Sequence, residues 1–260
     1  MFILVMAAAV ARADMLPQLD KKPWTGWFAG TENRKYRFGV DRKGDAFLMP
    51  MKNREEAIYN KQWIRFSPVI QEIREDGRLV TKKSETNGWT ALSEASAEAE
   101  KISYRGTVTG GAVFEVIFEI DKNEIRAGGR LVEQGTLTGN YRFAILTSIP
   151  NMHYGDKEDD KLEDKAGDDD YLFVRADGEK LKFDGWSEID ASEVNGEGFK
   201  SARIDIEAYG AKLDLMAGED GKLEFWNRGL QRAYRGVGVN WIHDHQKDPE
   251  GRSRFTIIFK

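Results

Sequence analysis

The amino-acid sequence predicts an all-β protein, built as a large antiparallel β-sandwich. The first observation is a repeated alternation of apolar and polar residues, which is the period of a strand with one buried face. The second is that tight turns rich in Gly, Asp and Asn interrupt this alternation, as in antiparallel hairpins. The third is that the strands are two-faced, so two half-wetted sheets can bury their apolar faces against each other. A closed or half-closed barrel is the alternative architecture.

The predicted strands begin shortly after residue 20. Residues 24–28 hold three aromatic side chains, and Tyr36, Phe38 and Val40 then alternate with basic residues and glycine. Such alternation is typical of a half-buried strand. Four turn segments mark the clearest hairpin tips, at residues 41–44, 75–77, 176–178 and 219–221.

The clearest single strand spans residues 114–120. Its even-numbered residues are all apolar, whereas Glu115 and Glu119 lie on the other face. Segment 93–100 suits a strand by its period and a helix by its propensity, and we expect a strand because β-rich residues 101–108 continue it. The two-faced pattern predicts further strands around residues 203–207, 213–215, 223–225 and 255–259.

Residues 1–13 predict a secretory signal peptide. The run is apolar, too short to span a bilayer, and closes on Ala-x-Ala at residues 11–13. No basic residue precedes it, so a buried N-terminal strand or helix is the alternative. We therefore expect export to the periplasm or the extracellular space. Because no linker-like segment divides the rest, we also expect a single all-β domain over residues 14–260.

The composition excludes several classes of function. The 260-residue chain has no cysteine, which rules out disulfides, thiolate catalysis and cysteine-ligated zinc. Its net charge is −5 and the basic residues are scattered among acidic ones, so nucleic-acid binding is not expected. Beyond the N-terminus no apolar run reaches membrane length, so no transmembrane segment is expected.

Histidine chemistry is confined to two places, because the chain has three histidines. If a strand runs through residues 240–245, His243 and His245 project from one face at a spacing that could hold a metal. With Glu250 downstream, this pattern resembles the cupin metal motif. However, 248–251 is typical of a hairpin turn, the spacing to Gly238 departs from the motif, and no third histidine follows. We therefore predict no metal, and interpret the pair as ligand-contacting histidines at a strand end.

A second candidate site lies around His153 and Tyr154. A Tyr or His that abstracts a proton, with Asn151 or Arg142 neutralising a uronate carboxylate, is the chemistry of a polysaccharide lyase. Four such residues near one another in the sequence do not make a motif. A polar loop after Pro150 is the simpler interpretation.

Residues 155–170 form a strongly acidic segment with one large apolar residue. Clustered carboxylates, densest at residues 168–170, are what calcium prefers, but the segment lacks the order of an EF-hand loop. A solvated loop is the simpler interpretation, so calcium is the one cofactor considered and none is predicted.

Two tryptophans, Trp226 and Trp241, sit among polar residues in the sequence. An exposed indole beside polar donors is a common way to grip a sugar. The many-stranded pattern also resembles sandwiches found beside carbohydrate-active enzymes. We therefore predict an exported, non-catalytic module that binds a glycan or another cell-surface polymer. The predicted ligand-binding residues are Trp226, Trp241, His243 and His245. The alternatives are a carbohydrate-active enzyme of the polysaccharide lyase or glycoside hydrolase type, and a structural or assembly protein.

Overall fold

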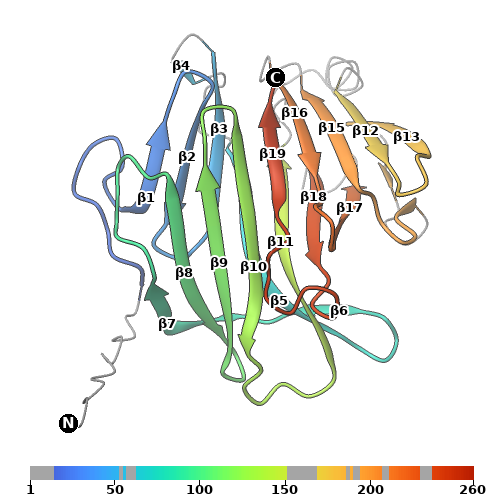
Figure 1. The fold of residues 1–260 in the computed structure, drawn as a ribbon, viewed down its shortest axis with the longest axis horizontal. Coiled ribbons are helices and arrows are strands. Elements are labelled where there is room, and N and C mark those ends of the chain that lie inside the picture. The colour runs from blue at the N-terminus through green and yellow to red at the C-terminus, as the bar shows by residue number, and fades with distance from the viewer. Residues whose placement is uncertain are drawn as a thin grey trace, which may run out of the picture.

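The computed structural model describes residues 15–52, 55–56, 63–150, 169–185, 188–189, 194–206, 211–228 and 236–260. Within these ranges the chain forms two large antiparallel β-sheets that stack face to face (Figure 1). The predicted sandwich is therefore confirmed, and neither sheet closes into a barrel in the described part of the chain. Across the same residues no helix has the length and apolar character needed to cross a membrane.

The first sheet has ten strands and carries most of the candidate site. Its order is β1-β2-β3-β5-β11-β18-β17-β14, with β4 paired to β3 and β6 paired to β5. Its strands are β1 (Trp27–Glu32), β2 (Tyr36–Asp41), β3 (Ala46–Lys52), β4 (Glu55–Glu56), β5 (Ile64–Ile73), β6 (Leu79–Thr81), β11 (Asn140–Pro150), β14 (Glu188–Ile189), β17 (Gly221–Arg228) and β18 (Gly236–His243).

The second sheet has nine strands in the order β13-β12-β15-β16-β19-β10-β9-β8-β7. Its strands are β7 (Ser84–Ala91), β8 (Lys101–Val108), β9 (Ala112–Ile120), β10 (Glu124–Glu133), β12 (Asp170–Val174), β13 (Lys180–Asp184), β15 (Ser201–Ile206), β16 (Ala211–Met216) and β19 (Phe255–Phe259). The strand predicted over residues 114–120 lies within β9, with its even-numbered side chains facing the other sheet or its margin.

The turn at residues 41–44 shows why the hairpin tips carry Asp and Gly. The Asp41 carboxylate accepts hydrogen bonds from the backbone N–H of Lys43 at 2.7 Å and of Asp45 at 3.1 Å. Gly44 has a φ of 75°, a conformation that residues with a Cβ rarely adopt. A Cβ at Gly44 would also lie 2.4 Å from the ring of Trp89. The predicted turn is therefore fixed by both backbone conformation and packing.

Segment 93–100 is the main difference from the predicted strands. It is irregular and runs beside β1, where the N–H of Gly30 donates to the carbonyl of Ser96 at 2.8 Å and the N–H of Ala99 donates to the carbonyl of Gly30 at 3.0 Å. β1 ends the first sheet, so these bonds cover its open edge. Only the following part of the prediction, β8, is a strand.

Aromatic side chains fill the space between the sheets. Phe225 on β17 stacks on Tyr171 and Phe183, with ring centroids 5.6 and 5.0 Å away, and lies 4.6 Å from Phe173. All three partners belong to β12 and β13 of the other sheet. Burial of this apolar area is the main stabilising contribution that joins the two sheets.

We expect Phe225→Ala to lower the free energy of unfolding by about 3–5 kcal/mol, because Phe225 is fully buried and its removal leaves a cavity. Urea denaturation followed by tryptophan fluorescence measures the change. Met216→Ala, at a side chain that is 48% exposed, is the control and should change stability by less than about 0.5 kcal/mol. Equal losses for the two variants would contradict the proposed role of this aromatic cluster.

Candidate functional site

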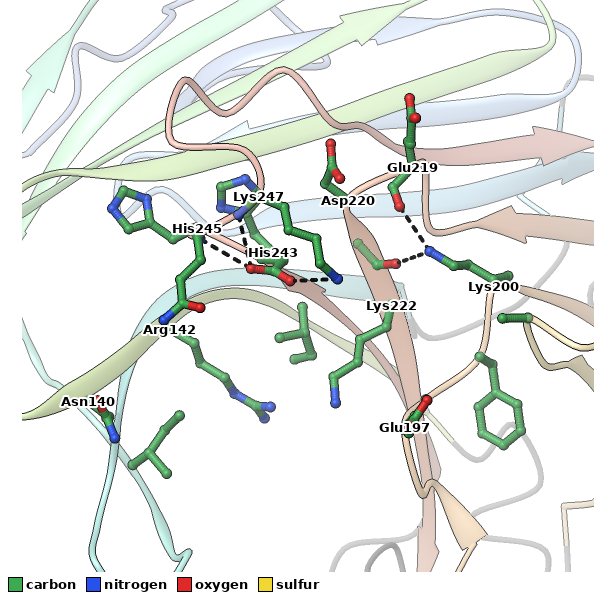
Figure 2. A pocket seen from close by; sticks show the side chains of 18 of the residues that line it. Asn140, Arg142, Glu197, Lys200, Glu219, Asp220, Lys222, His243, His245 and Lys247 are labelled. Carbon is green, nitrogen blue, oxygen red and sulfur yellow. Dashed lines mark hydrogen bonds and ion pairs between the residues drawn. The ribbon is translucent and has the colours of Figure 1, made fainter.

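A cleft of about 1030 Å³ opens at one end of the first sheet. Its walls come from the ends of β5, β11, β17 and β18 and from the turns at residues 175–177, 197–200 and 244–247. Figure 2 shows Arg142 and Lys222 pointing into the cleft, with His245 and Glu197 on opposite sides of them. Sites for small ligands are typically concave, with a few convergent polar groups. This cleft is therefore the candidate site.

Strand alternation places three charged side chains together on the outer face of the first sheet. On β17, Leu223 and Phe225 face the core, so Lys222 and Glu224 face outward. The Arg142 guanidinium on β11 holds the Glu224 carboxylate through two parallel bonds, of 3.0 and 2.9 Å. Lys222 Nζ lies 3.1 Å from the same carboxylate. We call these residues the Arg142–Glu224–Lys222 cluster.

Gln71 orients the guanidinium of Arg142. It lies opposite Arg142 on the neighbouring strand β5, and its side-chain oxygen accepts the Nε–H of Arg142 at 3.0 Å. Its amide nitrogen donates to the hydroxyl of Thr81 on β6 at 3.2 Å. The oxygen and the nitrogen of this buried amide are thus both hydrogen-bonded. These bonds fix the orientation of the guanidinium group that Arg142 presents to Glu224.

The cluster keeps Glu224 ionised. Burial opposes the charged form of this carboxyl, but the hydrogen bonds and positive charge of Arg142, together with Lys222, outweigh that effect and lower its pKa. The side chains of Arg142 and Glu224 are 14% and 19% exposed, so water screens their attraction only in part. The cluster is therefore a fixed, mostly desolvated group of charges beside the cleft.

The predicted histidine pair is separated by the end of β18. His243 is the last residue of this strand and is buried, with its Nε2 3.2 Å from Asp248 Oδ2. Burial lowers its pKa, despite the nearby carboxylate, so the imidazole stays neutral. A turn follows, in which the Asp244 carboxylate accepts the backbone N–H groups of Gln246 and Lys247. That turn exposes His245 in the cleft.

The expectation that both imidazoles share one face is therefore wrong. The ring centroids are 6.4 Å apart, one ring lies in the core and the other at the surface. Glu250 is directed elsewhere, 3.7 Å from Arg130. In the described ranges no three His, Cys, Asp or Glu side chains gather as metal ligands would.

The expectation of an exposed indole is wrong for Trp241. Its side chain has no exposed surface, and its Nε1–H donates to the carbonyl of Ala217 at 2.7 Å. Its polar neighbour Asn240 points to the other face of the strand, and the nearby His243 is buried on the same face, so the polar sequence context was misleading. Trp226 differs: it is half-buried on the same outer face as Glu224, and its indole lies against Gly238 on β18.

Several predicted candidates fall outside the described residues. These are the signal segment 1–13, His153, Tyr154, Asn151 and the acidic segment up to residue 168. Of the densest acidic residues, Asp169 is buried and Asp170 begins β12, where it pairs with Lys182 at 2.8 Å. Arg142, considered for a lyase site, instead holds Glu224.

Sequence reasoning missed Lys222, Glu224 and Gln71. Each occupies a polar position of an alternating strand, which is where solvated residues are normally found. The one usable signal was that Lys222 and Glu224 recur at a spacing of two between apolar residues, so they had to share a face.

Comparison with known proteins identifies the fold. No protein-family model and none of the curated proteins matches the chain. Among solved structures, a galactose mutarotase-like protein from Lactobacillus casei ATCC 334 has a TM-score of 0.51 at 9% identity, over 89% of this chain and 98% of that one. A protein from Escherichia coli K12 provisionally assigned as an aldose 1-epimerase has a TM-score of 0.45 at 8% identity, with the same coverage. The chain thus shares its fold with a mutarotase-like protein.

The first of these structures corrects the predicted function. The sequence favoured a non-catalytic glycan-binding module, whereas the structure that shares this fold is described as galactose mutarotase-like. The alternative, a carbohydrate-active enzyme, agrees better with that description. The main prediction failed because an all-β pattern with scattered tryptophans does not distinguish a binding module from an enzyme.

We expect Glu224→Gln to lower the free energy of unfolding by about 3 kcal/mol at neutral pH, because Arg142 and Lys222 lose their counter-ion. The folded-state pKa of Glu224 lies below its usual value of 4.5, so its ionic contribution is complete above that pH and is lost as the pH falls through the folded-state pKa.

Urea denaturation of the wild-type protein and of Glu224→Gln at a series of pH values tests this ionic contribution. The difference in unfolding free energy should be constant near neutrality and should shrink on acidification below about 4.5. A difference that is the same at every pH would contradict the ionic role of Glu224.

Proposed function

We propose that this protein is an enzyme that acts on a carbohydrate and interconverts the anomers of an aldose. The observation that carries the proposal is the cleft, in which an exposed histidine faces a mostly desolvated cluster of charges at the end of the sheet. The shared fold with a galactose mutarotase-like protein supports a sugar as the substrate.

The reaction requires two proton transfers. A base removes the proton of the anomeric hydroxyl while an acid protonates the ring oxygen, and the bond between the anomeric carbon and the ring oxygen breaks. The resulting open-chain aldehyde rotates about the bond to its neighbouring carbon. As the ring closes, the former acid takes back the proton of the ring hydroxyl, and the former base returns its proton to the new anomeric oxygen. No redox partner is needed, and the acid and base must come within hydrogen-bond reach of two oxygens that are bonded to the same anomeric carbon.

His245 is the residue we assign to one of these transfers. Histidine exchanges protons near neutral pH more readily than any other side chain. Its exposure in the cleft leaves it accessible to a substrate, whereas His243 is buried and neutral behind it. On the opposite side of the cleft, Glu197 offers a carboxylate for the second transfer.

The Arg142–Glu224–Lys222 cluster is assigned to substrate binding. The spare N–H donors of Arg142 and Lys222 and the lone pairs of the Glu224 carboxylate can form hydrogen bonds with the hydroxyls of a sugar. Trp226 is on the same outer face but is not among the residues that line the cleft, so we do not assign it to substrate binding. Export of the mature chain remains a separate prediction from the sequence.

We expect His245→Ala to slow anomer exchange by roughly 100-fold or more, which is the usual contribution of a general acid or base. Polarimetry or NMR exchange spectroscopy on a panel of aldoses measures the rate. Free imidazole should restore part of the activity, because it replaces the missing proton carrier, whereas it would not correct a structural defect.

The melting temperature of this variant should stay close to that of the wild type, since the side chain is exposed. The same panel includes glycosides and uronate polymers, so released reducing ends or unsaturated products would reveal a hydrolase or lyase instead. Full exchange activity in His245→Ala would remove His245 from the mechanism.

A further inference from the structure

A second hollow, of about 540 Å³, adjoins the cleft. It lies between the β5–β6 hairpin, residues 74–78, and the segment that enters β11 at residues 138–139. Ile73 and Gly139 line both hollows, so the two meet at these residues. In Figure 1 the β5–β6 hairpin extends outward from the lower end of the sandwich. We call the cleft and this second hollow together the groove, and residues of the hairpin line one part of it.

The groove has a larger volume than one sugar needs. Pockets of roughly 300–1000 Å³ hold drug-sized ligands, and the cleft alone reaches the upper end of that range. A single pyranose ring is much smaller than a drug-sized ligand. A monosaccharide bound beside His245 would therefore leave the hairpin end of the groove unfilled.

The hairpin end is polar in a way that suits hydroxyl groups. Arg78 Nε pairs with the Asp76 carboxylate at 2.6 Å, and Glu72 pairs with both Lys82, at 2.5 Å, and Arg74, at 3.4 Å. The Arg78 side chain is 80% exposed, and a guanidinium has more N–H donors than this contact uses. Together with Glu75, these residues carry as many negative as positive charges. A surface without net charge that has spare donors and acceptors is expected to bond a neutral, hydroxyl-rich ligand.

The hairpin is also tied to the charges of the cleft. Thr81 on the hairpin accepts a hydrogen bond from Gln71, which in turn accepts one from Arg142. The hairpin and the Arg142–Glu224–Lys222 cluster therefore hold a fixed relative position. A ligand that touches both meets one preformed surface.

We propose that the substrate is an oligosaccharide. Its reducing-end sugar lies in the cleft beside His245, and the following sugar units extend along the groove to Arg74 and Arg78. The placement of the reducing end rests on the proposed function, whereas the extension rests on the groove itself.

The test compares glucose, maltose and maltotriose, and in parallel galactose and its β-1,4-linked disaccharide and trisaccharide, by NMR exchange of the reducing-end anomers. We expect kcat/KM to rise about tenfold or more from monosaccharide to trisaccharide in at least one series. Arg78→Ala should reduce the ratio of trisaccharide to monosaccharide kcat/KM several-fold.

Arg126→Ala is the matched control, because Arg126 is also an exposed, ion-paired arginine but lies on β10 of the other sheet. It should leave that ratio unchanged. Equal kcat/KM for all chain lengths would overturn the oligosaccharide inference and leave the proposed function standing.

Absence of exchange with every sugar would instead remove the proposed function. In that case, calorimetric titration of the wild-type protein and of Arg78→Ala with the same sugars tests whether the groove binds an oligosaccharide, independently of any anomer exchange. Affinity that increases with chain length and falls in Arg78→Ala supports the groove, whereas affinity that is absent or independent of length overturns it.

Discussion

The contact of Trp241 with the opposite sheet is the interaction on which the rest of the structure depends. Its indole donates a hydrogen bond to Ala217, which follows β16, and stacks on Phe255 of β19 at 6.4 Å. Because side chains alternate along a strand, this anchor forces His243, two residues later, toward the core as well. β18 ends there, and the turn that follows brings His245 to the surface. The position of the exposed histidine is therefore set by packing between the sheets.

The same strands build the core with one face and the candidate site with the other. Phe225 packs against the second sheet, and its neighbour Glu224 faces outward to Arg142. The ion pair of Arg142 and Glu224 is stabilised by this arrangement. The sheet already holds the two backbones at a fixed spacing, so little conformational entropy is lost when the side chains pair. The Arg142–Glu224 pair is consequently more rigid than an ordinary surface ion pair, for which entropy cancels most of the attraction.

Sequence patterns predicted the architecture well because alternation and turn chemistry are local. The strand within β9 and the Asp41–Gly44 turn lie where the residues placed them. The site was harder to predict, since Arg142 and Glu224 are 82 residues apart and meet only through strand order. Trp241 was misjudged because neighbours in a strand point to opposite faces, so polar flanking residues say nothing about its burial. Segment 93–100 has the alternation of a strand, but it is irregular, and its backbone groups form hydrogen bonds with β1 at the edge of the first sheet.

The β5–β6 hairpin lies outside the core between the two sheets. The three residues of β6 are exposed. The hairpin is connected to the residues of the cleft by the Thr81–Gln71–Arg142 hydrogen bonds and by the few backbone pairs of β6 with β5. Insertions or substitutions at its tip would therefore cost little folding free energy, because they remove no buried apolar surface. Such a wall can diverge between related proteins while the residues for which we propose proton transfer are held by the sandwich. On the proposed function, one scaffold could give rise to enzymes that share a reaction and differ in the length of chain they accept.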